Sequence, residues 1–230
     1  MSRILTFAAV AALFAGLATT ASAEAPEGFI SLFDGKSLDG WEGKDFWSVK
    51  DGAITGQTTA EKPTKGNTFL LWKGELADFE LRLKFRIVGG NSGIQYRSRH
   101  VGDYVISGYQ ADIDSGTKYI GILYEEKARG ILALRGKKVV IDAEGGKQDV
   151  GTTGTDEEIL GSIKKEDWNE YTIIAKGNHL VQQINGHTTV DVTDNQESKR
   201  AMKGLLALQL HAGPPMLVQF KDIYLKKLND

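Results

Sequence analysis

Three segments of the sequence alternate polar side chains that could do chemistry with apolar ones that could not. The polar residues are Gln95, Arg97 and Arg99 in NSGIQYRSR, Gln110, Asp112 and Asp114 in GYQADID, and Gln209 and His211 in LALQLHAG. Side chains two apart on a β-strand point to the same side of the sheet. Each set would therefore share one face, and these polar faces are the predicted lining of a ligand site.

Four side chains are predicted to be able to transfer protons in such a site: His211, Asp112, Glu125 and Glu126. A neutral imidazole has a reference pKa near 6.5 and can act as a base at neutral pH. Asp112 would need a pKa raised by burial before it could donate a proton, so a polar or metal-binding role is predicted for it first. Adjacent strand residues point opposite ways, and at most one of Glu125 and Glu126 can face the site. The alternatives are a histidine satisfied at a strand end and carboxylates on a solvated face.

Amide and guanidinium side chains are the predicted substrate-binding groups, because they can hold carbonyl or hydroxyl oxygens of a ligand. They are Gln95, Arg97, Gln110, Arg135 and Gln209, with the indole of Trp72 as a stacking surface. For Arg97 the alternative is an ion pair with Asp112 across the strands. For Trp47 and Trp168, core packing is expected.

The elements that must position these residues are short β-strands separated by turns. FELRLKFRI, residues 79–87, alternates strictly between apolar and charged residues, which predicts a strand with one face in the core. Asp51-Gly52 and Asn185-Gly186 are typical of tight hairpin turns. Helical periodicity is weak after residue 24, apart from short turns near residues 156–163 and 164–168. The pattern predicts an all-β antiparallel sandwich.

The first 23 residues have the pattern of a secretory signal peptide. Arg3 precedes an uncharged apolar run, and Ala21-Ser22-Ala23 provides the small residues at which a signal peptidase cleaves. We therefore expect a mature single domain over residues 24–230, located in the periplasm or secreted, with no membrane insertion after cleavage. There is no cysteine, so disulfides and thiol chemistry are excluded. A net charge of −2 with dispersed Lys and Arg gives no indication of nucleic-acid binding.

Five segments in order resemble the 3-keto-disaccharide hydrolase family. They are GFISLFDGKSLDGWE (28–42), NSGIQYRS (91–98), GYQADI (108–113), WNEYTIIAKGNHLVQQINGH (168–187) and GLLALQLHAGPPMLVQFKDIYLKKL (204–228). The resemblance covers nearly all of the expected mature chain. It implies a jelly-roll sandwich of the concanavalin A-like lectin/glucanase type and an oligosaccharide or glycoside substrate already oxidised at C3.

The chemistry implied by this resemblance begins at C2 of the sugar, where the neighbouring carbonyl acidifies the hydrogen. A base removes that proton, hydrogen-bond donors or a cation stabilise the enolate, and the group on C1 departs, with or without later addition of water. We expect Asp112 and His211 to serve the proton transfers and Arg97 to hold the sugar. The paired-carboxylate pattern E-x-D-x-x-E of retaining glucanases is missing. The main alternative is a non-catalytic carbohydrate-binding module of the same fold, and the other is a scaffold or interaction domain.

No metal ligand set is assigned from the sequence, and no cofactor is certain. A divalent ion such as Ca²⁺, which prefers hard oxygen ligands, is the expectation if any metal binds. Its expected places are a structural site formed by Asp34 with Asp222, or the carboxylate face around Asp112.

Overall fold

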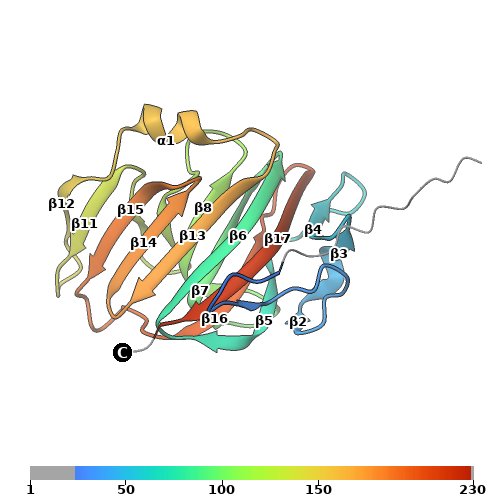
Figure 1. Cartoon of the computed structure of the whole chain (residues 1–230), viewed down its shortest axis with the longest axis horizontal. Coiled ribbons are helices and arrows are strands. Elements are labelled where there is room, and N and C mark those ends of the chain that lie inside the picture. Colours follow the sequence, from blue (N-terminus) through green and yellow to red (C-terminus); the bar gives the residue numbers. More distant parts are fainter. Residues whose placement is uncertain (1–23, 229–230) are drawn as a thin grey trace, which may run out of the picture.

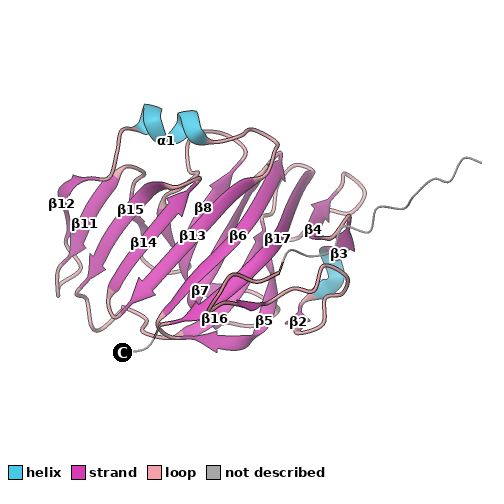
Figure 2. Ribbon diagram, viewed as in Figure 1, coloured by secondary structure: helices cyan, strands magenta, loops and turns pink. Residues whose placement is uncertain are grey.

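The computed structural model describes residues 24–228, so the signal peptide expected over residues 1–23 lies outside the described residues. Two β-sheets pack face to face, and the larger one faces the viewer in Figure 1. Helical structure is confined to a small part of the ribbon, as Figure 2 shows. It consists of the 3₁₀ turn Lys44–Phe46 and helix α1, Asp156–Ser162.

The larger sheet has ten strands. In spatial order they are β12 (Lys147–Thr152), β11 (Lys137–Ile141), β15 (His187–Asp194), β14 (His179–Ile184), β13 (Asn169–Lys176), β6 (Phe79–Val88), β17 (Met216–Lys227), β4 (Ala53–Thr58) and β3 (Trp47–Lys50), with β1 (Ile30–Ser31) beside β17.

The smaller sheet has seven strands. In spatial order they are β10 (Gly130–Ala133), β9 (Leu123–Glu126), β8 (Ile106–Asp114), β7 (Asn91–His100), β16 (Gly204–Leu210), β5 (Thr68–Leu76) and β2 (Trp41–Glu42).

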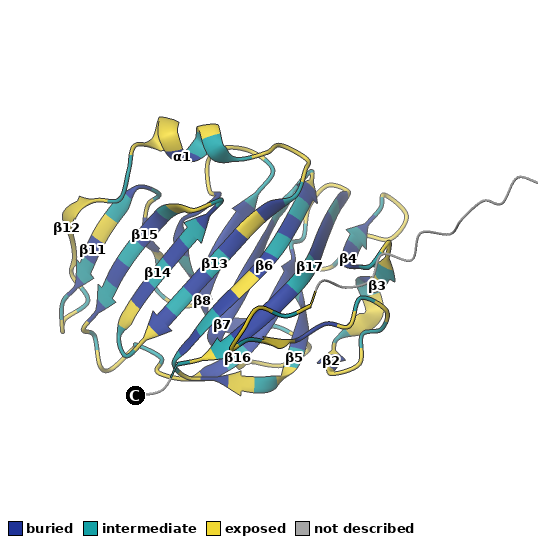
Figure 3. Cartoon of the chain, viewed as in Figure 1, coloured by how far each residue is buried: buried dark blue, intermediate teal, exposed yellow. Residues whose placement is uncertain are grey.

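The core lies between the sheets because one face of each strand is apolar. Along β6, the apolar residues at alternate positions are buried and the charged residues between them are more exposed, an alternation visible in Figure 3. Burial of apolar area stabilises a fold by roughly 25 cal/mol per Å², so this pattern determines which side of the strand faces inward. The tight turn at Asn185-Gly186 joins β14 to β15, and both residues have positive φ, as a type I′ turn requires.

The predicted β-sandwich is confirmed, with one departure from a purely antiparallel arrangement. Strand β11 runs antiparallel to β12 but parallel to β15. Helix α1 follows the predicted turn closely and begins with a capping box, in which Thr155 accepts from the Glu158 N–H and Glu158 accepts from the Thr155 N–H. Within residues 24–228, no helix has the length and apolar character needed to cross a membrane.

Candidate functional site

The outer face of the seven-stranded sheet carries a cavity of about 540 Å³. Strand β8 forms its floor: Tyr109, Ala111 and Ile113 point into the core, while the alternate residues point outward. The lining residues are Asn67, Asn91, Gln110, Asp112, Asp114, Lys118, Tyr119, Ile122, Tyr124, Glu126, Ile131, Gln209 and His211. A concave surface with convergent polar and ionisable groups is where a ligand is most often bound.

Asp112 lies at the centre of this polar group. Its side chain is largely removed from water, with the residue only 6% exposed, and its Oδ1 accepts a 3.0 Å hydrogen bond from Asn91 Nδ2. Burial raises the pKa of Asp112 from 3.8 to about 7, because desolvation disfavours the charged carboxylate more than the Asn91 hydrogen bond favours it. The neighbouring Asp114 raises this pKa further. A carboxyl group with such a pKa can both accept and donate a proton at neutral pH.

Glu126 is a further carboxyl group of the cavity, beside Asp112 and Asp114, and projects from β9. Burial raises its pKa, while the charges of Lys127 and His211 and hydrogen bonds from Asn67 and Gln209 oppose the increase. The Gln209 amide nitrogen donates to Glu126 Oε2 at 3.4 Å. Gln209 Oε1 is buried without a hydrogen-bond partner among the described residues, although it is at the cavity. A ligand hydroxyl could satisfy this acceptor.

His211 follows the end of β16 and lines the same cavity. Its Nδ1 contacts the carbonyl oxygen of Ala212, which can only accept a hydrogen bond, so Nδ1 carries the proton and Nε2 of the neutral ring is the acceptor. Strand β7 lies between β8 and β16, so His211 and Asp112 are on alternate strands of the sheet.

Gln95 and Gln110 form a polar layer on the floor of the cavity. Gln95 Nε2 donates to Gln110 Oε1 at 2.7 Å, and the Ser98 hydroxyl donates to Gln95 Oε1 at 2.8 Å. Gly93 gives the Gln110 side chain room, since a Cβ there would lie 2.5 Å from Gln110 Cδ and Cγ. Gln110 reaches the cavity directly, whereas Gln95 acts on it through Gln110.

The β8–β9 connection supplies residues that the sequence reasoning missed. Lys118 and Tyr119 reach the cavity from this loop, and Asp114 holds the loop by accepting from the Gly116 and Tyr119 N–H groups at 3.1 Å each. The direction of a loop side chain cannot be predicted from a periodic pattern, so the sequence did not identify Lys118 as a cavity residue. Asn91 could have been identified from the sequence, because it is the first residue of the NSGIQYRS segment.

Glu125 requires a correction, because it points away from the cavity. Its Oε2 accepts from Arg129 Nε at 2.6 Å, and the same guanidinium contacts Asp194 Oδ2 at 2.7 Å. The Tyr109 hydroxyl also donates to Asp194, at 2.6 Å. Of the two adjacent glutamates, only Glu126 faces the site, as the alternation of strand side chains requires.

Arg97 is also corrected, because a bulge turns it away from the cavity. The β7–β8 register shifts between Tyr96 and Arg99, and Arg97 has a φ of 46°. Its guanidinium is buried, with the residue 2% exposed, and pairs with Asp78 at 2.7 Å instead of with Asp112. Backbone carbonyls of Ala77, Gly177 and Ala201 accept its other hydrogen bonds. Arg97 therefore connects strands and cannot hold a sugar in this cavity.

Arg135 and Trp72 lie outside the cavity lining as well. Arg135 forms a two-point ion pair with Asp156 of α1 and donates to the Ile120 carbonyl at 2.6 Å. Arg135 thus connects the β8–β9 loop to helix α1. Trp72 is half-buried against the core, where its ring lies over Gly74.

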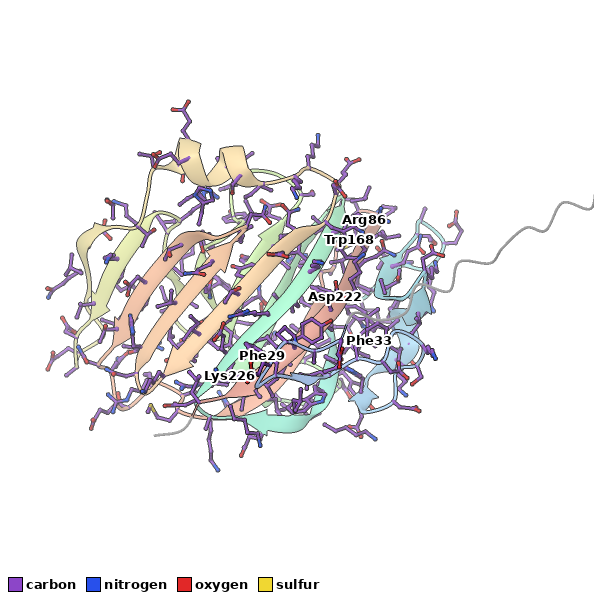
Figure 4. The ribbon with its side chains drawn as sticks, viewed as in Figure 1. Phe29, Phe33, Arg86, Trp168, Asp222 and Lys226 are labelled. Carbon is purple, nitrogen blue, oxygen red and sulfur yellow. The ribbon has the colours of Figure 1, made fainter. Side chains whose placement is uncertain are left out.

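The outer face of the ten-stranded sheet has a different character, with aromatic rings that are already in contact with cations. Arg86 and Lys221 lie 5.5 and 4.1 Å from the Trp168 ring centroid. Phe29 and Lys226 lie toward the opposite end of the face, with a contact of 5.8 Å (Figure 4). Trp168 is therefore a partly exposed surface residue and not the core residue that we expected, whereas Trp47 is buried.

The two expected Ca²⁺ locations do not gather ligands. The Asp34 carboxylate accepts the Lys36 and Ser37 N–H groups, and Asp222 pairs with Lys84 at 3.0 Å. Over residues 24–228, no group of three His, Cys, Asp or Glu side chains is close enough to hold a metal ion.

Comparison with known proteins agrees with a carbohydrate-active domain. Residues 28–226 match the family model described as a 3-keto-alpha-glucoside-1,2-lyase-like domain. A 3-keto-disaccharide hydrolase of Bacteroides thetaiotaomicron is 34% identical over 84 residues, which are 33% of this chain and 29% of that protein. The aligned part is thus less than a third of that relative's length.

Solved structures share the fold at low sequence identity. A candidate glycosyl hydrolase of Parabacteroides distasonis has a TM-score of 0.60 at 19% identity, covering 88% of this chain and 95% of that one. The carbohydrate-binding module CBM66 of Bacillus subtilis has a TM-score of 0.55 at 13% identity, covering 82% and 96%. A galectin-like B. subtilis protein has a TM-score of 0.56 at 7% identity, covering 83% and 90%. These likenesses establish the fold.

Proposed function

The chain belongs to the 3-keto-alpha-glucoside-1,2-lyase-like family, and on this basis we propose that it cleaves the glycosidic bond of 3-keto-glycosides in the cavity above β8. The observation that carries the proposal is Asp112, a buried carboxyl group whose pKa is raised to about 7 in a cavity large enough for a sugar. Buried groups with perturbed pKa values are common at catalytic sites.

Asp112 is the base in this proposal. Its ionised form takes the proton from C2, the electron pair becomes an enolate on the C3 oxygen, and the bond from C1 to the leaving oxygen then breaks. A base works best when its pKa is close to the working pH. Asn91 keeps the Asp112 carboxyl group oriented through the 3.0 Å hydrogen bond.

Glu126 and Lys118 fill the two other roles. Because its pKa is raised by burial, Glu126 retains a proton to higher pH than an exposed glutamate and can give it to the leaving oxygen. Lys118 brings a positive charge to the lining from the β8–β9 loop, where it can stabilise the enolate oxygen. This role replaces the one expected of Arg97. His211 and Gln209 then contact sugar hydroxyls.

Elimination and hydrolysis share these steps and differ in the fate of the unsaturated sugar. Departure of the C1 group leaves a double bond between C1 and C2, and the product released at this stage is that of a lyase. Addition of water at C1, with return of a proton to C2, gives net hydrolysis. Asp112 holds the proton that it took from C2 and can return it.

The test is incubation of the purified mature protein with 4-nitrophenyl 3-keto-glucoside and, in parallel, with the unoxidised glucoside. We expect release of nitrophenol from the keto substrate alone, because only the C3 carbonyl acidifies the C2 proton. Mass spectrometry of the sugar product distinguishes elimination from hydrolysis. Binding of the keto substrate without release would instead support a carbohydrate-binding module, and release from both substrates would contradict the C2 mechanism.

We also propose that the protein works after export, since the pattern of residues 1–23 is typical of a signal peptide. N-terminal sequencing of the protein recovered outside the cytoplasm should begin at Glu24. A start at Met1 would contradict export with cleavage.

A further inference from the structure

A second cavity, of about 460 Å³, lies at the end of the seven-stranded sheet where β7 ends and β8 begins. The end of β9 and the connection from β15 to β16 complete it. Its polar lining includes Arg99, Ser107, Lys127, Ser198, Lys199 and Lys203, and we call it the basic cavity. It shares no lining residue with the proposed catalytic cavity.

Three cations in the lining of the basic cavity have no ion-pair partner, whereas Lys203 is paired with Glu75. The carboxylate in its lining, Glu125, is already paired with Arg129. Within residues 24–228, Arg99, Lys127 and Lys199 have no carboxylate oxygen within 4.0 Å of their charged nitrogens. Three unpaired cations around one cavity repel one another, and an anion placed between them removes that repulsion.

A serine hydroxyl adds a directional group to this charge. Ser107 is 3% exposed and lines the cavity, and its hydroxyl makes no hydrogen bond within the described part of the chain. The hydroxyl oxygen itself is accessible to solvent, so it is free to donate a hydrogen bond to a ligand in the cavity.

We propose that the basic cavity binds an oxyanion, that is, a phosphate, sulfate or carboxylate group. The cations of Arg99, Lys127 and Lys199 neutralise its charge, and Ser107 donates a hydrogen bond to one of its oxygens. Charge-assisted hydrogen bonds of this kind are shorter and stronger than neutral ones. The anion has two sources with the same chemistry, a free inorganic ion or an anionic substituent on a sugar.

Isothermal titration of the mature protein with sodium phosphate and, separately, with glucose 6-phosphate tests the proposal and distinguishes the two sources. Binding of either ligand that weakens as ionic strength rises supports an oxyanion site, and glucose 6-phosphate binding more tightly identifies a sugar substituent as the better ligand. We expect the double variant R99Q/K199Q to bind at least about tenfold more weakly. No heat with either ligand at millimolar concentration would overturn the proposal.

Two controls separate a built site from general attraction to a basic surface. The double variant K36Q/K44Q removes the same charge from exposed lysines outside both cavities and should bind like the unaltered protein. Ser107→Ala removes the hydroxyl without changing charge and should weaken binding several-fold. If K36Q/K44Q weakens binding as much as R99Q/K199Q, or if Ser107→Ala has no effect, the anion is attracted to the surface and the proposed site is wrong. Thermal melts of all variants verify that they are folded.

Discussion

Replacement of Asp112 by Asn should remove activity and, at alkaline pH, stabilise the protein. The folded protein holds the pKa of Asp112 at about 7, against an ordinary value of 3.8. When the pH lies between these two pKa values, the folded state binds more protons than the unfolded state, so the stability of the folded protein falls as pH rises. Asparagine keeps the shape of the neutral carboxyl group and carries no charge, and the variant should lack this fall.

The size of the effect is set by the distance between the two pKa values. The gap from 3.8 to about 7 corresponds to about 4 kcal/mol of unfolding free energy. Part of this is already lost at low pH, where the unfolded chain ionises, so the fall between about pH 4.5 and about pH 8.5 is roughly 3 kcal/mol. Asp112 is nearly enclosed, so solvent screening removes little of this penalty.

The assay is urea unfolding at a series of pH values, with the unfolding free energies of the two proteins subtracted at each pH. The free energy of Asp112→Asn minus that of the unaltered protein should increase by roughly 3 kcal/mol from about pH 4.5 to about pH 8.5. In the same proteins, turnover of the keto-glucoside should fall by roughly two to four orders of magnitude, as expected when a group that transfers a proton is removed.

Asp39→Asn is the matched control, because Asp39 is exposed and its carboxylate makes no hydrogen bond within the described residues. Its difference from the unaltered protein should stay flat with pH. If the difference for Asp112→Asn is equally flat, burial does not raise the pKa of Asp112, and the argument for Asp112 as the base fails. If the stability difference is as expected but turnover is unchanged, the raised pKa of the buried Asp112 is supported and its catalytic role is rejected.

Further variants test the parts of the site separately. For the unaltered enzyme, kcat/KM should rise as pH increases through about 7, as Asp112 becomes ionised; a flat profile from about pH 5 to about pH 9 would contradict its role as base. Glu125→Gln weakens a buried ion pair with Arg129 and should lower the unfolding free energy by about 3 kcal/mol, with little effect on turnover by the folded protein; a large loss of turnover would return Glu125 to the catalytic site. Gly93→Ala should displace Gln110 and raise KM, measured with the keto-glucoside, and an unchanged KM would show that the position of Gln110 is unimportant. Gln209→Met removes the unpartnered acceptor and should raise KM roughly tenfold without loss of thermal stability; an unchanged KM would exclude a sugar contact there.

Alternation of side chains along strands made several site residues predictable. On β8, Gln110, Asp112 and Asp114 all line the cavity, because a regular strand repeats every two residues. The same rule predicted that Gln209 and His211 share a face, and that only one of Glu125 and Glu126 faces the site. It failed for Arg97, because the bulge after Tyr96 inserts a residue that the period of two does not include.

Local patterns in the amino-acid sequence were enough to specify the β-sandwich and the polar faces of its strands, because both depend on short-range spacing of apolar residues and turns. The choice between Glu125 and Glu126 required the packed structure, since it depends on which face of β9 lies against the core. Packing also brought Lys118 into the lining from a loop and Asn91 next to Asp112. The raised pKa of Asp112 is likewise a tertiary property, because it arises from burial among segments that are distant in the sequence.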